Sequence, residues 1–240
     1  MNKIDFIGDN HGHDTWKEIV HKNSDADQFV FVGDYFDAYL ITPTVQIENF
    51  KDIIKFKEAN PKTVTLLVGN HDFHYMPHCK GTYGGYSHIF AQEIGEVLRQ
   101  NKHHLQAAWQ YANILVTHAG VSATWYEKHF PEHGNLFYAC MGYQKIADKV
   151  NQLWDERPDL FNFSGPTRDG NSTENGPLWI RPEALRSDPM DSTLIQIVGH
   201  TQRENISEKD KVFTIDALPR EYLIWNHDHF EIKFLYSKKP

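Results

Sequence analysis

The sequence predicts an α/β fold of four layers, in which two mixed β-sheets pack together and helices flank them. In the first third of the chain, an apolar run, a polar tip and a helical segment follow one another three times, as in a parallel sheet. The run at residues 29–32, Phe-Val-Phe-Val, has no polar interruption, which is typical of a strand buried on both faces. Further apolar runs in the second half of the chain predict the strands of the second sheet.

The first hundred residues alternate between the two kinds of element. Apolar runs that end in a small or polar residue predict strands at 4–8, 29–32 and 63–68. Apolar residues at helical spacing predict helices at 14–22, 43–60 and 90–98. We expect Asp14 to cap the first of these helices, and Val45 to lie on the apolar face of the second.

The second half of the chain continues with strands, helices and one long irregular loop. Strand patterns occupy 105–116 and 194–198. One helical pattern begins at Ser122, and a second, longer one covers 136–153. Gly, Ser, Asn and Pro residues predict a surface loop at 162–177. The segments 211–217, 221–225 and 230–236 are expected to form a terminal antiparallel meander. No repeat or linker divides the chain, so we expect one domain over residues 1–240.

Composition limits the classes of function. The 24 basic and 32 acidic residues give a formal charge of −8 without long runs of either sign, which argues against nucleic-acid binding. No apolar stretch approaches the ~20 residues that span a bilayer, and the first residues lack a leader-like apolar core. Cys79 and Cys140 have neither zinc-site nor disulfide spacing. We therefore expect a soluble, cytoplasmic protein, and the sequence leaves its oligomeric state open.

Five predicted strands end in residues that commonly bind metals. These ends are Asp9-x-His11, Asp34-x-x-Asp37, Asn70-His71, His118 and His200. One such residue alone is more often a turn residue, a helix cap or a satisfied histidine. Because a parallel sheet brings such ends to one edge, their recurrence predicts a metal site at the carboxyl ends of the strands.

The mixture of oxygen and nitrogen donors indicates which metals to expect. It favours Mn, Fe, Zn or Mg over a thiolate zinc site or an all-oxygen calcium site. One bridging carboxylate can hold two cations about 3.5–4 Å apart, an arrangement suited to phosphate hydrolysis. A water shared between such cations loses a proton near neutral pH and attacks phosphorus in line. The cofactors expected here are therefore two divalent ions, with Mn as the first choice and Fe, Zn, Ni, Co or Mg as alternatives.

Five motifs carry a resemblance to a known family. In order, they are Gly-Asp-x-His-Gly, Gly-Asp-x-x-Asp, Gly-Asn-His-Asp, His-Ala-Gly and Gly-His-Thr. Over most of the chain, from Gly8 to roughly Asp216, they resemble the calcineurin-like metallophosphoesterase superfamily. The spacing of Asp34 and Asp37, together with segments 118–122 and 177–181, is most similar to the phosphoprotein-phosphatase branch and its bacterial and phage members. The resemblance implies a metallophosphatase that hydrolyses phosphoric ester bonds.

The same resemblance implies a set of metal ligands. These are Asp9, His11, Asp34, Asn70, His118 and His200. In the family pattern, Asp34 bridges both metals, the first two residues complete the first site, and the last three complete the second.

The resemblance also implies three catalytic roles. His71 matches the general acid that protonates the leaving alkoxide, and Asp37 matches the residue that orients its imidazole. Arg181 falls where such enzymes place an arginine that grips the phosphate with its two-pronged guanidinium.

Two positions depart from the family pattern. Most members of this branch follow the second aspartate with an arginine that contacts phosphate, and here that residue is Ala38. Arg168, Arg181 or Arg203 would have to replace this contact. Gln202 stands where many superfamily members have a last histidine, as expected for the phosphoprotein-phosphatase branch, and this argues against a nuclease or a cyclic-nucleotide phosphodiesterase.

Three functions follow from these patterns, and the substrate separates the first two. The first is hydrolysis of phosphomonoesters, on a phosphorylated small molecule or a phosphoprotein. The second is hydrolysis of a dinucleoside polyphosphate by the same centre, with the aromatic segment 75–86 available for a nucleobase. The third is a catalytically inactive metal-binding scaffold, which would predict loss of the acid or its partner, although His71 and Asp37 are both present.

Overall fold

The structure is a computed structural model that describes residues 1–131, 144–166 and 169–235. Its first sheet has the strand order β11-β10-β1-β2-β3-β4. The strands are β1 (Lys3–Ile7), β2 (Gln28–Phe31), β3 (Val64–Leu67), β4 (Leu105–Gln106), β10 (Glu221–Asn226) and β11 (His229–Phe234). The four strands β1 to β4 are parallel, whereas β10 runs antiparallel to β1 and to β11. The sheet is therefore mixed, as predicted.

The second sheet has the order β5-β6-β7-β9-β8. Its strands are β5 (Ala108–Tyr111), β6 (Ile114–Thr117), β7 (Ile195–Val198), β8 (Ser207–Lys209) and β9 (Val212–Thr214). Strands β6, β7 and β9 are parallel, and the two edge strands are antiparallel to their neighbours. Apolar side chains of both sheets form one cluster, in which Phe6 and Val30 join Val116 and Ile197. The two sheets thus pack against each other, which confirms the predicted fold class.

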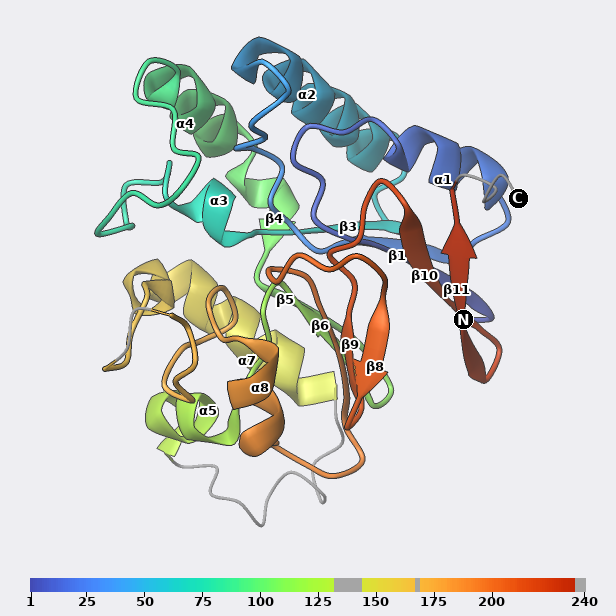
Figure 1. The fold of residues 1–240 in the computed structure, drawn as a ribbon, viewed down its shortest axis with the longest axis vertical. Coiled ribbons are helices and arrows are strands. Elements are labelled where there is room, and N and C mark those ends of the chain that lie inside the picture. The colour runs from blue at the N-terminus through green and yellow to red at the C-terminus, as the bar shows by residue number, and fades with distance from the viewer. Residues whose placement is uncertain (132–143, 167–168, 236–240) are drawn as a thin grey trace.

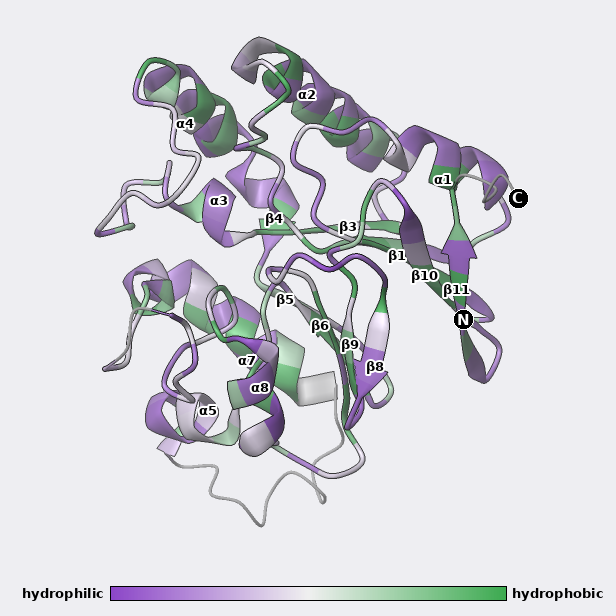
Figure 2. Cartoon of the chain, in the orientation of Figure 1, coloured by the Kyte–Doolittle hydropathy of each residue, from purple (hydrophilic) through white to green (hydrophobic). Residues whose placement is uncertain are grey.

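Helices flank the pair of sheets (Figure 1). The first sheet is accompanied by α1 (Trp16–Lys22), α2 (Pro43–Ala59), α3 (Asn70–Phe73) and α4 (Ala91–Gln100), and the second by α5 (Ala123–His129), α7 (Gln144–Glu156) and α8 (Pro182–Ser187). Within the described ranges, the short 3₁₀ turns η1 (Lys102–His104) and η3 (Pro158–Phe161) link these elements. Apolar segments mark the central strands, while α2 and α4 alternate between polar and apolar residues (Figure 2). Within the described residues, no helix combines the length and apolar character needed to cross a membrane.

Two predictions about helices need correction. Asp14 does not cap α1 with its side chain; Thr15 occupies the N-cap position, and the Asp14 backbone carbonyl accepts from the Lys17 N–H at 3.0 Å. Val45 lies off the buried face of α2 and is 54% exposed. It precedes Ile47 by two residues, which turns it by about 200° around the helix. The predicted helix at 136–153 corresponds to α7, which continues to Glu156; residues 136–143 lie outside the described residues.

The strands predicted in the second half of the chain are divided between the two sheets. The segment 105–116 forms strands, as predicted, and it forms three of them because the chain passes from the first sheet to the second at Ala107. Asn151 of α7 stabilises this crossing by accepting from the backbone N–H groups of Ala107 and Ala108 at 3.0 and 2.9 Å. The terminal meander is confirmed for β10 and β11, which pair antiparallel, and is wrong for β9, which lies in the second sheet. An apolar pattern identifies strands without identifying their partners.

Candidate metal centre

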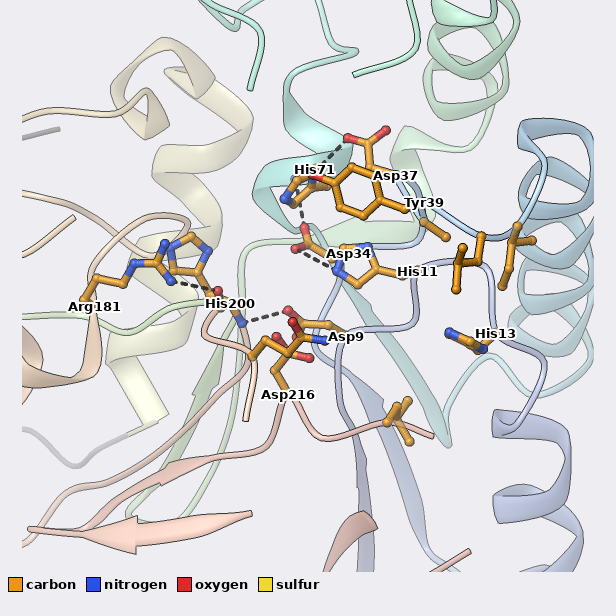
Figure 3. A pocket seen from close by; sticks show the side chains of 15 residues that line it. Asp9, His11, His13, Asp34, Asp37, Tyr39, His71, Arg181, His200 and Asp216 are labelled. Carbon is orange, nitrogen blue, oxygen red and sulfur yellow. Dashed lines mark hydrogen bonds and ion pairs between the residues drawn. The ribbon is translucent and has the colours of Figure 1, made fainter. Parts of the chain in front are cut away.

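The ends of five strands supply the residues of the centre. Asp9, Asp34 and Asn70 follow the parallel strands β1, β2 and β3 of the first sheet. His118 and His200 follow β6 and β7 of the second sheet. Figure 3 shows His200 and Arg181 approaching Asp9, Asp34 and His71 from the opposite side of the cavity. The packing of two sheets therefore brings together residues separated by up to 191 positions, as in the hydrogen bond from the His200 N–H to Asp9 Oδ2 at 2.8 Å.

The backbone of the centre adopts conformations that non-glycine residues seldom take. The φ angle is positive at His11 (43°), Asp34 (53°), Asp37 (70°) and His200 (60°). Such residues cost free energy and persist only where surrounding contacts fix them, commonly at functional sites. The positive φ angles set the directions in which these side chains leave the strand ends.

Asp72 supplies many of the contacts that fix the Asp34 turn. Its buried carboxylate accepts hydrogen bonds from the backbone N–H groups of Asp34 (2.9 Å), Tyr35 (2.8 Å) and Gly69 (2.8 Å). Burial raises the pKa of Asp72 well above its usual value, and the nearby charge of Asp34 adds to this effect. This role of Asp72 could not be predicted from the sequence, because a residue that accepts from backbone N–H groups leaves no spacing pattern of its own.

Two glycines of the motifs allow close approach. A Cβ atom at Gly69 would lie 2.1 Å from Asp34 Oδ1, and a Cβ atom at Gly199 would lie 1.8 Å from Asp9 Oδ1. Any side chain at either position would displace a carboxylate of the centre. These two positions therefore require glycine for space.

Asp9, His11 and Asp34 form the first candidate ligand cluster. Their ligand-type atoms lie within 4.8 Å of one another, and His11 Nε2 is 3.8 Å from Asp34 Oδ2. His11 Nδ1 lies 2.6 Å from the Phe36 carbonyl, so it carries the proton and leaves the Nε2 lone pair facing the cluster. Asp9 Oδ1 is buried and has no hydrogen-bond partner among the described residues. A cation would satisfy this oxygen, so the three residues fit a metal site.

Asn70, His118 and His200 form a second cluster beside Asp34. Asn70 Oδ1 lies 2.7 Å from His118 Nε2 and 2.8 Å from His200 Nδ1, and His118 Nε2 is 3.4 Å from Asp34 Oδ2. The other ring nitrogens face the carbonyl oxygens of Val32 (2.9 Å) and Trp179 (3.1 Å), to which they donate.

The protonation of these two histidines decides what the second cluster can bind. Burial lowers the pKa of His118, and burial, aided by the charge of Arg181, lowers the pKa of His200 well below its usual value. Both rings are therefore neutral, with lone pairs on His118 Nε2 and His200 Nδ1. Three acceptor atoms, including Asn70 Oδ1, then face one another without a proton to share. A cation satisfies all three at once, so the residues present fit a second metal.

Carboxylate charge accumulates in the same place. Burial raises the pKa of Asp9 well above its usual value, with further contributions from Asp216 and Asp34. Burial also raises the pKa of Asp216 to about 6. Burial alone would raise the pKa of Asp34 too, but the neighbouring imidazoles, led by His118, hold it below its usual value. Bound cations would relieve this concentration of negative charge.

Asp37, His71 and His74 bring three further ligand-type atoms within 4.8 Å. Asp37 Oδ2 lies 2.8 Å from His71 Nδ1 and 2.6 Å from His74 Nε2, and Asp37 Oδ1 accepts from the Tyr75 hydroxyl at 2.5 Å. Both carboxylate oxygens thus face donors already, which is the geometry of a hydrogen-bonded network. No sequence pattern predicted His74 and Tyr75 as partners of Asp37.

The charge state of His71 follows from its two carboxylate neighbours. Burial would lower the pKa of His71, but the charges of Asp34 and Asp37 and the hydrogen bond to Asp37 raise it to about 9. The imidazole is therefore protonated at neutral pH, with Nδ1 directed at Asp37.

Arg181 lies at the edge of the centre. Its Nη1 donates to the His200 carbonyl at 3.2 Å and to Thr201 Oγ1 at 3.1 Å, so the guanidinium has a fixed position. Arg203 lines neither of the two cavities at the centre, and Arg168 lies outside the described residues. Arg181 and Arg203 are the described candidates for the phosphate contact that is missing at Ala38. Of these two, only Arg181 lines these cavities.

Two cavities lined by described residues open onto the centre. One, of about 470 Å³, contains Asp9, Asp34 and Asp216, and its lining residues are drawn in Figure 3. The other, of about 720 Å³, has an aromatic wall formed by Tyr83, Phe163 and Trp179. Tyr39, His71, Arg181 and His200 line both cavities.

The fold and these ligands define a two-sheet α/β protein with a candidate metal centre at converging strand ends. The model of the calcineurin-like phosphoesterase family matches residues 2–204, so the chain belongs to that family. Membership implies a metal-dependent hydrolase of phosphoric esters.

Two solved structures share the fold at low sequence identity. A protein serine/threonine phosphatase from Saccharomyces cerevisiae is 17% identical with a TM-score of 0.57; the match covers 100% of this chain and 81% of that one. A metallophosphoesterase from Sphaerobacter thermophilus is 13% identical with a TM-score of 0.50; the match covers 99% of this chain and 89% of that one. At such identities, the likeness establishes the fold alone.

Proposed function

We propose that this protein is a metal-dependent phosphomonoesterase that hydrolyses its substrate by direct attack of water, without a phosphorylated enzyme. The observation that carries the proposal is the group of acceptor atoms from Asn70, His118 and His200, which face one another beside Asp34. Family membership supports the class of reaction. The yeast structure is named as a serine/threonine phosphatase, which makes a phosphoprotein one candidate substrate.

The proposed ligands fall into two sets that share Asp34. Asp9, His11 and Asp34 would hold one divalent cation. Asp34, Asn70, His118 and His200 would hold the other. When bound, the two cations supply positive charge that stabilises the phosphoryl oxygens and acidifies water. We propose Mn as the preferred ion.

Three side chains of this protein would handle the substrate. His71 would protonate the leaving oxygen from Nε2, since Nδ1 faces Asp37 and the ring lines both cavities. Asp37 would orient the ring and favour its protonated form. Arg181, which the His200 carbonyl and Thr201 hold in place, would bind phosphoryl oxygens.

The test measures phosphate release with Mn, Ni, Co, Zn and Mg from p-nitrophenyl phosphate and from a phosphoserine peptide. Asp34→Asn should abolish release from both. His71→Asn should lower turnover of the peptide by about a hundredfold or more, and that of p-nitrophenyl phosphate less, because p-nitrophenolate leaves without a proton. The rate of hydrolysis of diadenosine tetraphosphate, a phosphoanhydride, is measured in parallel and compared with the rates for the two monoesters.

Matched controls are Asp228→Asn and His103→Asn, which change exposed residues outside both cavities. Both should retain full turnover. Turnover by a rigorously metal-stripped sample at the rate of the loaded protein would refute the proposal. Equal losses for the two substrates in His71→Asn would refute the role given to His71.

A further inference from the structure

The larger of the two cavities at the centre is built around aromatic rings. The rings of Tyr83 and Trp179 lie 4.2 Å apart between centroids at 50°, and those of Phe163 and Trp179 lie 5.6 Å apart at 83°. The Trp179 indole N–H donates to the Phe161 carbonyl at 2.9 Å, which fixes the central ring of this group. Trp179 is buried, whereas Tyr83 and Phe163 are only half-buried and present ring surface to the cavity. We call this group the aromatic wall.

The segment that carries Tyr83 is attached to the side chains around Asp37. The Tyr83 backbone N–H donates to His74 Nδ1 at 3.3 Å, and the Ser87 N–H donates to the Tyr75 hydroxyl at 2.8 Å. Gly85, with φ +88°, packs so closely that a Cβ atom there would lie 2.8 Å from Asp37 Cβ. Since His74 and Tyr75 also contact Asp37, the wall has a fixed position relative to His71.

The smaller cavity offers a different environment. It is lined by the carboxylates of Asp9, Asp34, Asp37 and Asp216. Apart from histidines, the aromatic residue in its lining is Tyr39, which also lines the larger cavity. A planar apolar group is therefore better accommodated in the larger cavity, where aromatic rings stack on aromatic rings. His71 borders that cavity, so a group bonded to the leaving oxygen can reach the wall.

We infer that the aromatic wall is a subsite for the leaving group, and that the preferred substrates are phosphomonoesters whose leaving group carries an aromatic ring. This inference rests on the proposed function, since it names the substrate class for the same centre. A nucleoside and a tyrosyl group share the required chemistry, a planar ring that can stack on the rings of the aromatic wall.

The first experiment measures binding without turnover. Isothermal titration of the Mn-loaded protein compares phenylphosphonate with cyclohexylphosphonate, two ligands of similar size that differ in aromaticity and contain no hydrolysable ester. The phenyl compound should bind about tenfold more tightly, and Tyr83→Leu should remove most of this preference, while Tyr83→Phe should keep it. Equal affinities for the two phosphonates in the wild type would overturn the inference.

The second experiment measures turnover. The ratio of kcat/KM for an aromatic monoester to that for phosphoserine should fall about tenfold in Tyr83→Leu and remain within about twofold in Tyr83→Phe. Adenosine monophosphate and a capped phosphotyrosine serve as separate aromatic substrates, and the one that shows the larger fall identifies the source of the ring. An unchanged ratio for both would overturn the inference.

The two measurements separate failure of the subsite from failure of the proposed function. Phosphate release without any aromatic preference would refute the subsite and leave the phosphatase activity standing. Selective binding of phenylphosphonate without release from any monoester would refute the activity and support the subsite.

Discussion

At the scale of single residues, Asp5 shows how an unpaired buried carboxyl group affects the stability of this protein. Asp5 lies in the middle of β1 and is fully buried. Neither carboxylate oxygen has a hydrogen-bond partner within the described part of the chain. Burial raises the pKa of Asp5 from its ordinary value of 3.8 to about 7, although Lys3 opposes the shift. The folded protein therefore binds a proton at Asp5 that the unfolded chain releases.

We expect Asp5→Asn to stabilise the protein at high pH. Because the folded-state pKa lies above the unfolded value, protonation of Asp5 stabilises the wild type fully below pH 3.8, and this contribution is lost as pH rises through about 7. The amide does not titrate, so the variant should gain on the order of 4 kcal/mol in unfolding free energy relative to wild type between pH 4 and pH 8. Urea denaturation across this range measures the difference.

Asp228→Asn is the matched control, because it removes an exposed carboxylate. It should shift the unfolding free energy by a similar small amount at every pH. If Asp5→Asn differs from wild type by the same amount at pH 4 and pH 8, the side chain is already charged in the folded state, contrary to expectation.

At the scale of elements, α5 illustrates how one cap joins two segments. Ser122 occupies the N-cap position and accepts from the Trp125 N–H at 3.1 Å, as the helical pattern from Ser122 predicted. The same hydroxyl donates to the Thr173 carbonyl at 2.5 Å, in the irregular loop that precedes Trp179. Ser122 is fully buried, so neither hydrogen bond can be replaced by water.

We expect Ser122→Ala to lower the free energy of unfolding by about 1–3 kcal/mol, since it removes a cap and leaves a buried carbonyl unsatisfied. Thermal and urea denaturation measure this loss. Ser24→Ala changes an exposed serine and should leave the stability within about 0.5 kcal/mol. A Ser122→Ala variant as stable as Ser24→Ala would show that the Thr173 carbonyl finds another donor.

At the scale of the whole molecule, the candidate metal centre connects the two sheets. Asp9, Asp34 and Asn70 belong to strand ends of the first sheet, whereas His118 and His200 belong to the second. Without a cation, these acceptors and carboxylates oppose one another across the contact between the sheets. Metal binding should therefore stabilise the folded state, which alone brings the ligands together.

We expect Mn²⁺ at about a hundredfold above its Kd to add about 2.7 kcal/mol of stability. For a chain of this length, this corresponds to a rise in Tm on the order of 5 °C. Calorimetry with and without Mn²⁺ measures the shift, and EDTA should reverse it. Asp34→Asn should lose the shift and Asp228→Asn should retain it; a Tm that is independent of Mn²⁺ in the wild type would contradict a shared centre.

The sequence alone determined the parts of this protein that local patterns encode. Apolar runs ending in Gly-Asp, Gly-Asn and Gly-His identified the strands that lead to Asp9, Asp34, Asn70 and His200, because a buried strand needs uninterrupted apolar residues and a ligand at its end needs a turn. The motifs also identified the family. Residue types and their order along the chain were sufficient for these conclusions.

Tertiary structure decided what depends on contacts between distant segments. It assigned β9 and β10 to different sheets, joined His74 and Tyr75 to Asp37, and brought Tyr83 against Trp179. Neither periodicity nor spacing specifies which strand pairs with which, or which ring meets a residue nearly a hundred positions away. These choices minimise the free energy of the packed molecule as a whole, and for that reason no local stretch of sequence contains them.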